Sequence, residues 1–193
     1  PCVGTINGLW ANALWKGGII PIETKWFYSN TFLDFKLTGM QGDVMQESMG
    51  VAKTLATSLT TSTKMKSFMS SVKISKLQGI HIHCPEGAVP KDGPSAGTAI
   101  TVALYSLINK KKIKNTIAIT GEINLQGQVT AIGGLDLKIL GGIKAGVREF
   151  IYPKENHKDF VQFMEKFEQK DEVKGIIFHE VTRIEQVLKL VFV

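Results

Sequence analysis

The chain has 193 residues, a formal net charge of +6 and a hydrophobic fraction of 44%, which fits one soluble globular domain and excludes a disordered chain. No apolar run approaches the roughly 20 residues that a membrane-spanning helix needs. The two cysteines, Cys2 and Cys84, are too few for a disulfide framework. We therefore expect an intracellular, reducing location, in the cytoplasm or the mitochondrial matrix.

The chain begins at Pro1 without an initiator methionine, and its first residues form neither a charged leader nor an apolar signal segment. We therefore expect an excised fragment or a processed product. The basic charge permits binding to a polyanion such as nucleic acid. However, the densest basic run, residues 109–115, fits a solvated connecting turn, and no basic stripe interleaved with aromatic residues occurs. Nucleic acid is therefore an open but unsupported partner.

The first half of the chain predicts two strands and one long helix. Residues 18–25 read as a strand, and residues 32–38 alternate well enough to form another. From Val44 to Leu59 apolar residues recur at helical spacing. Residues 57–75 are rich in Ser, Thr and Lys, and we expect a helix end followed by a loop there.

The second half alternates strands and helices more clearly. Residues 79–84 form a predicted strand that places His81 and His83 on one face, and a loop with three prolines then leads into a helix. Residues 116–120 read as a buried strand with residues 128–132 as its hairpin partner. The other expected elements are helices at 95–109, 135–145, 158–167 and 183–190 and strands at 150–152 and 175–179. Because hairpins interrupt the alternation, a mixed sheet is favoured over a parallel one.

The sequence Asp92-Gly-Pro-Ser-Ala-Gly97 allows two interpretations. Proline and Asp at these positions are ordinary signals for the start of a helix. A serine there also lies where free backbone N–H groups and the helix dipole favour a developing oxyanion. The small residues around it permit the close approach of another segment. The local sequence leaves a well-formed helix N-terminus and a nucleophilic Ser95 equally open.

A serine nucleophile needs a base, and none of the four histidines is marked as one. For His81 and His83 we expect a core-facing or supporting role. The sequence His81-Ile-His83-Cys84 offers too few donors for a metal site, so no metal is expected.

Lys138 is the other candidate base. Its helical neighbours at −4, +3 and +4 are Gly134, Gly141 and Gly142, which allow another segment to approach closely. The alternative is a surface lysine whose aliphatic stem covers apolar residues.

A lysine base needs a large change in pKa. At the ordinary pKa of about 10.4, only roughly one lysine in a thousand is neutral near pH 7.4. Burial must lower the pKa by about 3 units, which costs about 4 kcal/mol. The neutral amine then needs a hydrogen-bond partner. Thr120, at the end of a buried strand, has the right chemistry, although a plain strand-end hydroxyl is the alternative.

Together these motifs resemble the proteolytic domain of the Lon protease family, in its ATP-dependent bacterial and mitochondrial type. The likeness spans nearly the whole chain and consists of segments 3–10, 39–48, 85–97 with Ser95, 119–123 with Thr120, 127–138 with Lys138, and 151–156. The resemblance implies an α+β fold of mixed sheets and packed helices, similar to domain 2 of a ribosomal protein. It implies one domain, 1–193, with an N-terminal lobe at about 1–78 and a catalytic lobe at about 79–193.

The resemblance also implies a serine endopeptidase acting on unfolded or damaged proteins. Ser95 would attack the peptide carbonyl, Lys138 would act as general base and then as general acid, and Thr120 would orient Lys138. The residues implied around this pair are the oxyanion-hole amides of Asp92, Gly93 and Ser95 and the nearby side chains of Glu23, His81, His83 and Glu122.

The chain contains no G-x-x-x-x-G-K-[ST] phosphate loop, so no cofactor is expected in this domain. The resemblance places ATP and Mg²⁺ in a separate ATPase module of the full-length protein and implies a hexameric ring. The alternative function is a non-proteolytic Lon-like module for assembly or DNA handling. The joint presence of Ser95, Thr120 and Lys138 argues against that alternative.

Overall fold

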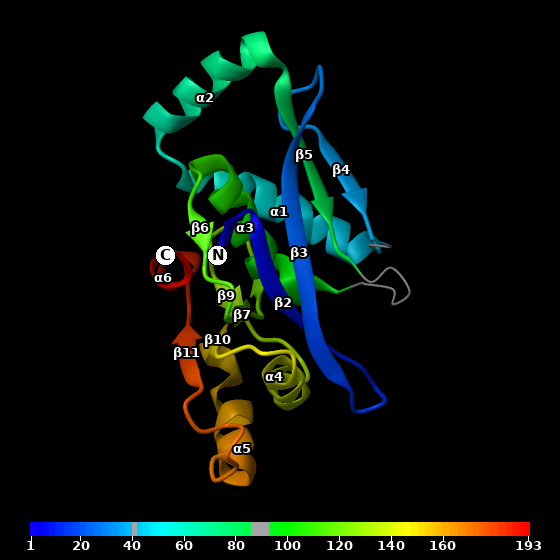
Figure 1. Cartoon of the computed structure of the whole chain (residues 1–193), viewed down its shortest axis with the longest axis vertical. Coiled ribbons are helices and arrows are strands. Elements are labelled where there is room, and N and C mark those ends of the chain that lie inside the picture. Colours follow the sequence, from blue (N-terminus) through cyan, green and yellow to red (C-terminus); the bar gives the residue numbers. More distant parts are fainter. Residues whose placement is uncertain (40–41, 86–92) are drawn as a thin grey trace.

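The computed structural model describes residues 1–39, 42–85 and 93–193. Within these residues, a seven-stranded mixed sheet has the order β11-β10-β7-β2-β3-β5-β4 (Figure 1). In that order the strands are β11 (Ile177–Val181), β10 (Glu149–Pro153), β7 (Ile117–Ile119), β2 (Thr5–Ala11), β3 (Gly17–Tyr28), β5 (Leu77–His83) and β4 (Phe35–Thr38). Two small sheets pair β1 (Cys2–Val3) with β6 (Lys112–Ile113), and β8 (Glu122–Ile123) with β9 (Val129–Thr130).

Helices cover both faces of the central strands. They are α1 (Asp43–Leu59), α2 (Ser62–Ser75), α3 (Gly97–Asn109), α4 (Leu135–Lys144), α5 (His157–Phe167) and α6 (Ile184–Val191), with short 3₁₀ turns at Pro94–Ala96 and Lys154–Asn156. One apolar core joins α1, α3 and α6 to one face of the sheet, and a second core joins α4 and α5 to the other. β7 contributes to both, because Ile117 and Ile119 enter the first core and Ala118 enters the second.

The expected mixed sheet is confirmed, because β7 pairs in parallel with β2 and β10 while β3 pairs antiparallel with β2 and β5. Most expected elements also form, within a few residues of their predicted limits. The strand predicted at residues 175–179 instead runs from Ile177 to Val181. None of the helices in the described ranges is long and apolar enough to cross a membrane.

The loop expected within residues 57–75 is wrong, because Ser62–Ser75 forms the helix α2. The Thr61 side chain caps its first turn by accepting a hydrogen bond from the Lys64 N–H group. Phe68 then packs its ring against Trp26 and Phe32, at centroid distances of 4.8 and 5.7 Å. The Ser/Thr/Lys-rich composition concealed this helix, because most of its side chains are exposed and Val72 is its one buried residue.

The predicted hairpin between residues 116–120 and 128–132 is also wrong. β7 lies between two parallel partners, whereas β9 pairs with β8. An apolar run buried on both faces is typical of an interior parallel strand. That pattern does not indicate which strands pair with it. The lobe division near residue 78 stays a prediction.

Candidate active site

Lys138 is buried in the contact between α4 and the sheet. Its exposed fraction is 4%, which contradicts the alternative of a surface lysine. Its Nζ donates a hydrogen bond to Thr120 Oγ1 at 3.2 Å. Burial lowers its pKa to about 8, against a smaller opposing effect of the Glu122 charge. In the described part of the chain, no carboxylate forms an ion pair with it.

Glycines bring α4 unusually close to β3. A Cβ added at Gly141 would lie 2.2 Å from the carbonyl carbon of Gly17, and one added at Gly17 would lie 2.1 Å from the Leu137 carbonyl oxygen. Helix and strand therefore touch backbone to backbone at this point. The glycine-lined face predicted around Lys138 is present, and it keeps that side chain away from solvent.

The burial of Lys138 predicts a pH-dependent cost in stability. Because its folded pKa of about 8 lies below the ordinary 10.5, the unfolded chain holds a proton between these pH values that the folded chain has lost. The free energy of unfolding therefore rises with pH through this window, and the cost is fully present below pH 8. We expect Lys138→Met to raise the free energy of unfolding at pH 7 by about 2 kcal/mol, after loss of the Thr120 hydrogen bond.

Urea unfolding of wild type and Lys138→Met at pH 7 and pH 10.5 measures this effect. The advantage of the variant should disappear at the higher pH. Lys144→Met, at an exposed position of the same helix, is the matched control and should show no such pH dependence. A Lys138→Met variant that gains nothing at pH 7 would contradict the lowered pKa.

The end of β7 connects the two faces of the sheet. Thr120, which is 1% exposed, contacts Lys138 on the α4 side. The next residue, Gly121, donates its N–H to the Ser95 carbonyl oxygen at 2.9 Å. Its own carbonyl accepts hydrogen bonds from the Thr98 N–H and hydroxyl groups at 3.2 and 2.9 Å. Two consecutive residues thus hold the segment that carries Ser95 and the side chain of Lys138.

Ser95 lies in the 3₁₀ turn Pro94–Ala96 and is partly exposed, directly before α3 begins at Gly97. This position places it at the positive dipole end of a long helix, where the N–H groups of Gly97 and Thr98 are bound to the carbonyl oxygens of Pro94 and Gly121. Gly93 precedes this turn and Ser95 lies in it, and their expected role as oxyanion-hole amides stays a prediction. Asp92, the third expected member, lies outside the described residues, as does most of the proline-containing loop before it.

The predicted surrounding residues separate into two groups. Glu122, in β8, lies close enough to influence the pKa of Lys138. His81 Nε2 and His83 Nδ1 both hydrogen-bond to Thr38 Oγ1, at 2.8 and 2.6 Å, and Glu23 lies opposite His83 in the strand register.

The second group consists of His81, His83 and Glu23, which form a separate cluster with Thr38 on β3, β4 and β5. Within the described residues, no hydrogen bond joins His81, His83 or Glu23 to Ser95 or Lys138. Burial lowers the pKa of His81, with smaller contributions from Lys36 and His83. No group of three His, Cys, Asp or Glu residues in the described ranges is arranged to hold a metal ion.

Sequence reasoning missed two residues of the site. Thr38 bridges the two histidines, and Gly121 bonds the Ser95 segment. Gly121 had a weak signal in the sequence, because a glycine after a buried strand often marks the close approach of another segment. The structure has such an approach, since a Cβ there would lie 2.6 Å from Val129 Cγ1. Thr38 had no comparable signal, because its partners lie more than 40 residues away.

Comparison with known proteins gives one family over the entire chain. The family model described as the Lon protease C-terminal proteolytic domain matches residues 1–193. The Lon protease of Treponema pallidum (strain Nichols) is 40% identical over 158 residues, covering 82% of this chain and 17% of the relative. That of Borrelia duttonii (strain Ly) is 40% identical over 191 residues, covering 98% and 22%.

A third relative is similar to the chain from end to end. The Lon protease of Mesomycoplasma hyopneumoniae (strain 232) is 39% identical over 193 residues, covering 100% of this chain and 20% of the relative. The chain thus spans about a fifth of the length of the curated relatives that it matches.

Proposed function

The chain belongs to the Lon protease family, as its C-terminal proteolytic domain, and we propose that Ser95 and Lys138 are the catalytic dyad of this peptidase. Membership of the family accounts for the peptidase class, and the dyad is the specific assignment to be tested. The observation that carries it is the state of Lys138. Its amine is buried, bound to the Thr120 hydroxyl, and has a pKa of about 8.

A pKa of about 8 makes Lys138 an effective base at physiological pH. Roughly a fifth of the side chains are neutral at pH 7.4, against about one in a thousand for an ordinary lysine. A general base works best when its pKa lies near the working pH. Thr120 Oγ1, as the acceptor of the Lys138 N–H bond, leaves the nitrogen lone pair of the neutral amine free for a proton from serine.

The proposed reaction has two halves. Ser95 Oγ attacks the carbonyl carbon of the peptide bond while Lys138 Nζ takes the hydroxyl proton. N–H groups at Gly93 and Ser95, and at Asp92, bind the oxygen on which negative charge develops. The Lys138 ammonium then protonates the leaving amine, and an ester on Ser95 remains. Water attacks this ester with Lys138 again as base, which releases the acid product and restores the serine.

The titration of Lys138 predicts the pH dependence of the reaction. The base acts in its neutral form, so we expect kcat/KM to rise about tenfold per pH unit below pH 8 and to level off above it. The measurement is cleavage of a fluorogenic peptide by the full-length protein between pH 6 and 10, with ATP hydrolysis followed at each pH as a control. A limb centred near pH 6.5 would indicate a histidine base and contradict the assignment.

The activity of the whole protein is a further part of the proposal. We propose that the full-length protein is an intracellular, ATP-dependent protease that degrades unfolded or damaged proteins. ATP and Mg²⁺ would bind to an ATPase module outside residues 1–193, and the subunits would form a hexameric ring. The naming of similar, longer proteins as Lon protease supports this. Light scattering and ATP-dependent casein cleavage by the full-length protein test it.

A further inference from the structure

We propose that Arg183 is a positioning residue for the active site, which it serves by holding the turn between β8 and β9 in place. Its effect on catalysis rests on the proposed Ser95–Lys138 dyad, whereas its effect on the backbone near Ser95 does not. Arg183 directly precedes α6 and is 57 residues from the turn that it contacts.

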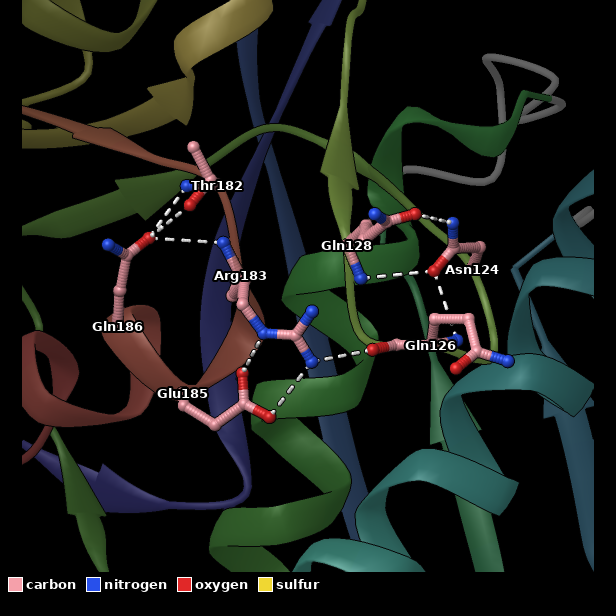
Figure 2. A network of polar contacts seen from close by, with 7 residues as sticks. All are labelled: Asn124, Gln126, Gln128, Thr182, Arg183, Glu185 and Gln186. Carbon is pink, nitrogen blue, oxygen red and sulfur yellow. Dashed lines mark hydrogen bonds and ion pairs between the residues drawn. The ribbon is translucent and has the colours of Figure 1, made fainter.

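The Arg183 guanidinium connects two segments that are distant in sequence (Figure 2). Its Nη2 donates a hydrogen bond to the Gln126 carbonyl oxygen at 2.7 Å. Its Nε forms an ion pair with Glu185 Oε2 at 3.2 Å, and its Nη2 also donates to Glu185 Oε1 at 3.4 Å. A charged donor makes the bond to Gln126 stronger than one between neutral groups.

The turn that receives this bond is itself firmly built. Asn124 Oδ1 accepts hydrogen bonds from the N–H groups of Gln126 and Gln128, each at 3.0 Å. Gly127 has a φ of +80°, and a Cβ there would lie 3.1 Å from Ile184 Cγ2 and 3.4 Å from Arg183 Nη2. The Ile184 N–H group donates to the Gly127 carbonyl at 2.9 Å. The turn and the start of α6 therefore interlock, and the positive φ together with the nearby Ile184 side chain favours glycine at position 127.

Both strands of this hairpin touch the catalytic segment. β8 begins at Glu122, directly after Gly121, whose N–H group binds the Ser95 carbonyl oxygen. Ile123 lies against Gly97 at the start of α3, with 3.1 Å between its Cγ2 and a Cβ placed there. β9 contributes Val129, which packs against Gly121. A shift of the turn therefore displaces the backbone that holds Ser95, on one side through the chain and on the other through Val129.

A purely local role for Arg183 is to begin α6. However, the start of that helix has its own bonds, because Gln186 Oε1 accepts from the N–H groups of Thr182 and Arg183 at 2.7 and 3.1 Å. The guanidinium is not needed for those bonds. It pairs with Glu185 of α6 and also reaches Gln126 across the gap between the two segments, so the bond to Gln126 is its specific contribution to the hairpin.

The test compares Arg183→Ala with Arg148→Ala in the full-length protein. Arg148 is exposed and serves as the matched control. The first readout is amide hydrogen exchange at Gly121, with Thr24, whose N–H binds the Gly4 carbonyl at 2.9 Å, as a distant reference. We expect Arg183→Ala to speed exchange at Gly121 at least about tenfold more than at Thr24. Equal acceleration at both amides would indicate general destabilisation and overturn the proposal.

The second readout is peptide cleavage by the same variants. We expect kcat to fall between about tenfold and 100-fold in Arg183→Ala with little change in KM, because substrate still binds while Ser95 is misplaced. Arg183→Lys retains one charged donor for Gln126 and should recover most of the loss. Gly127→Ala, which disturbs the same contact from the hairpin side, should reproduce it.

The two readouts separate the possible failures. An unchanged kcat alongside faster Gly121 exchange would overturn the positioning role. If instead Lys138→Ala proved active, the dyad would fail, and the exchange experiment would still decide whether Arg183 holds the hairpin.

Discussion

Ser95→Ala and Lys138→Ala are each expected to abolish peptide-bond hydrolysis, with kcat lower by about four orders of magnitude or more. The serine variant lacks the nucleophile, and the lysine variant leaves a hydroxyl that is almost never ionised near neutral pH. The two losses should not add in the double variant, because the residues act as one unit. Cleavage of casein and of a short fluorogenic peptide by the full-length protein measures the effect.

The controls for this prediction lie in the same elements. Lys144→Ala, at an exposed position of α4, should leave cleavage unchanged, and ATP hydrolysis should persist in all variants. Thr120→Val keeps the shape of the side chain but removes the hydroxyl that receives the Lys138 bond. We expect it to retain part of the activity, about tenfold to 100-fold below wild type. Near-normal cleavage by Lys138→Ala would exclude the dyad.

Gly141→Ala is expected to lower both stability and activity, although it adds a single methyl group. That group would lie 2.2 Å from the Gly17 carbonyl carbon, and backbone atoms of a paired strand cannot turn aside as a flexible side chain can. Helix α4 must then move away from β3, and Lys138 moves with it. We expect a loss of about 2–3 kcal/mol in the free energy of unfolding and at least about a 100-fold lower kcat/KM.

Gly50→Ala provides the matched control for this substitution. Gly50 lies within α1, and a Cβ there meets no atom within 4 Å. Alanine should therefore raise stability by about 0.5–1 kcal/mol through its better helix propensity. Denaturant unfolding of both variants gives the comparison. If Gly141→Ala were as stable as wild type, the close contact between α4 and β3 would be wrong.

The sequence predicted the parts of the fold that depend on local patterns. Apolar periodicity located α1, and alternation placed His81 and His83 on one face, where both reach Thr38. The glycines three and four residues after Lys138 indicated a close approach, and the structure has one at Gly141. These predictions succeeded because their physical cause lies within one or two turns of the residue concerned.

The failures involve contacts between distant segments. Nothing near β7 indicates that its neighbours are β2 and β10, and nothing near α2 indicates that Phe68 meets Trp26. The bond from Arg183 to Gln126 has the same character. Each contact depends on how whole helices and strands pack against one another. The sequence pattern within either segment therefore does not predict which segment it contacts.

The junction at the end of β7 sets the relative position of Lys138 and the Ser95 segment. Thr120 and Gly121 share a planar peptide group, and one contacts Lys138 while the other binds the Ser95 segment. The Lys138 side chain and the Ser95 segment are therefore both positioned by the Thr120–Gly121 peptide group. Thermal displacements of the sheet carry the two together, and only movements relative to this one peptide change their separation. The shared peptide group therefore limits how far the Ser95 segment and the Lys138 side chain can move relative to each other.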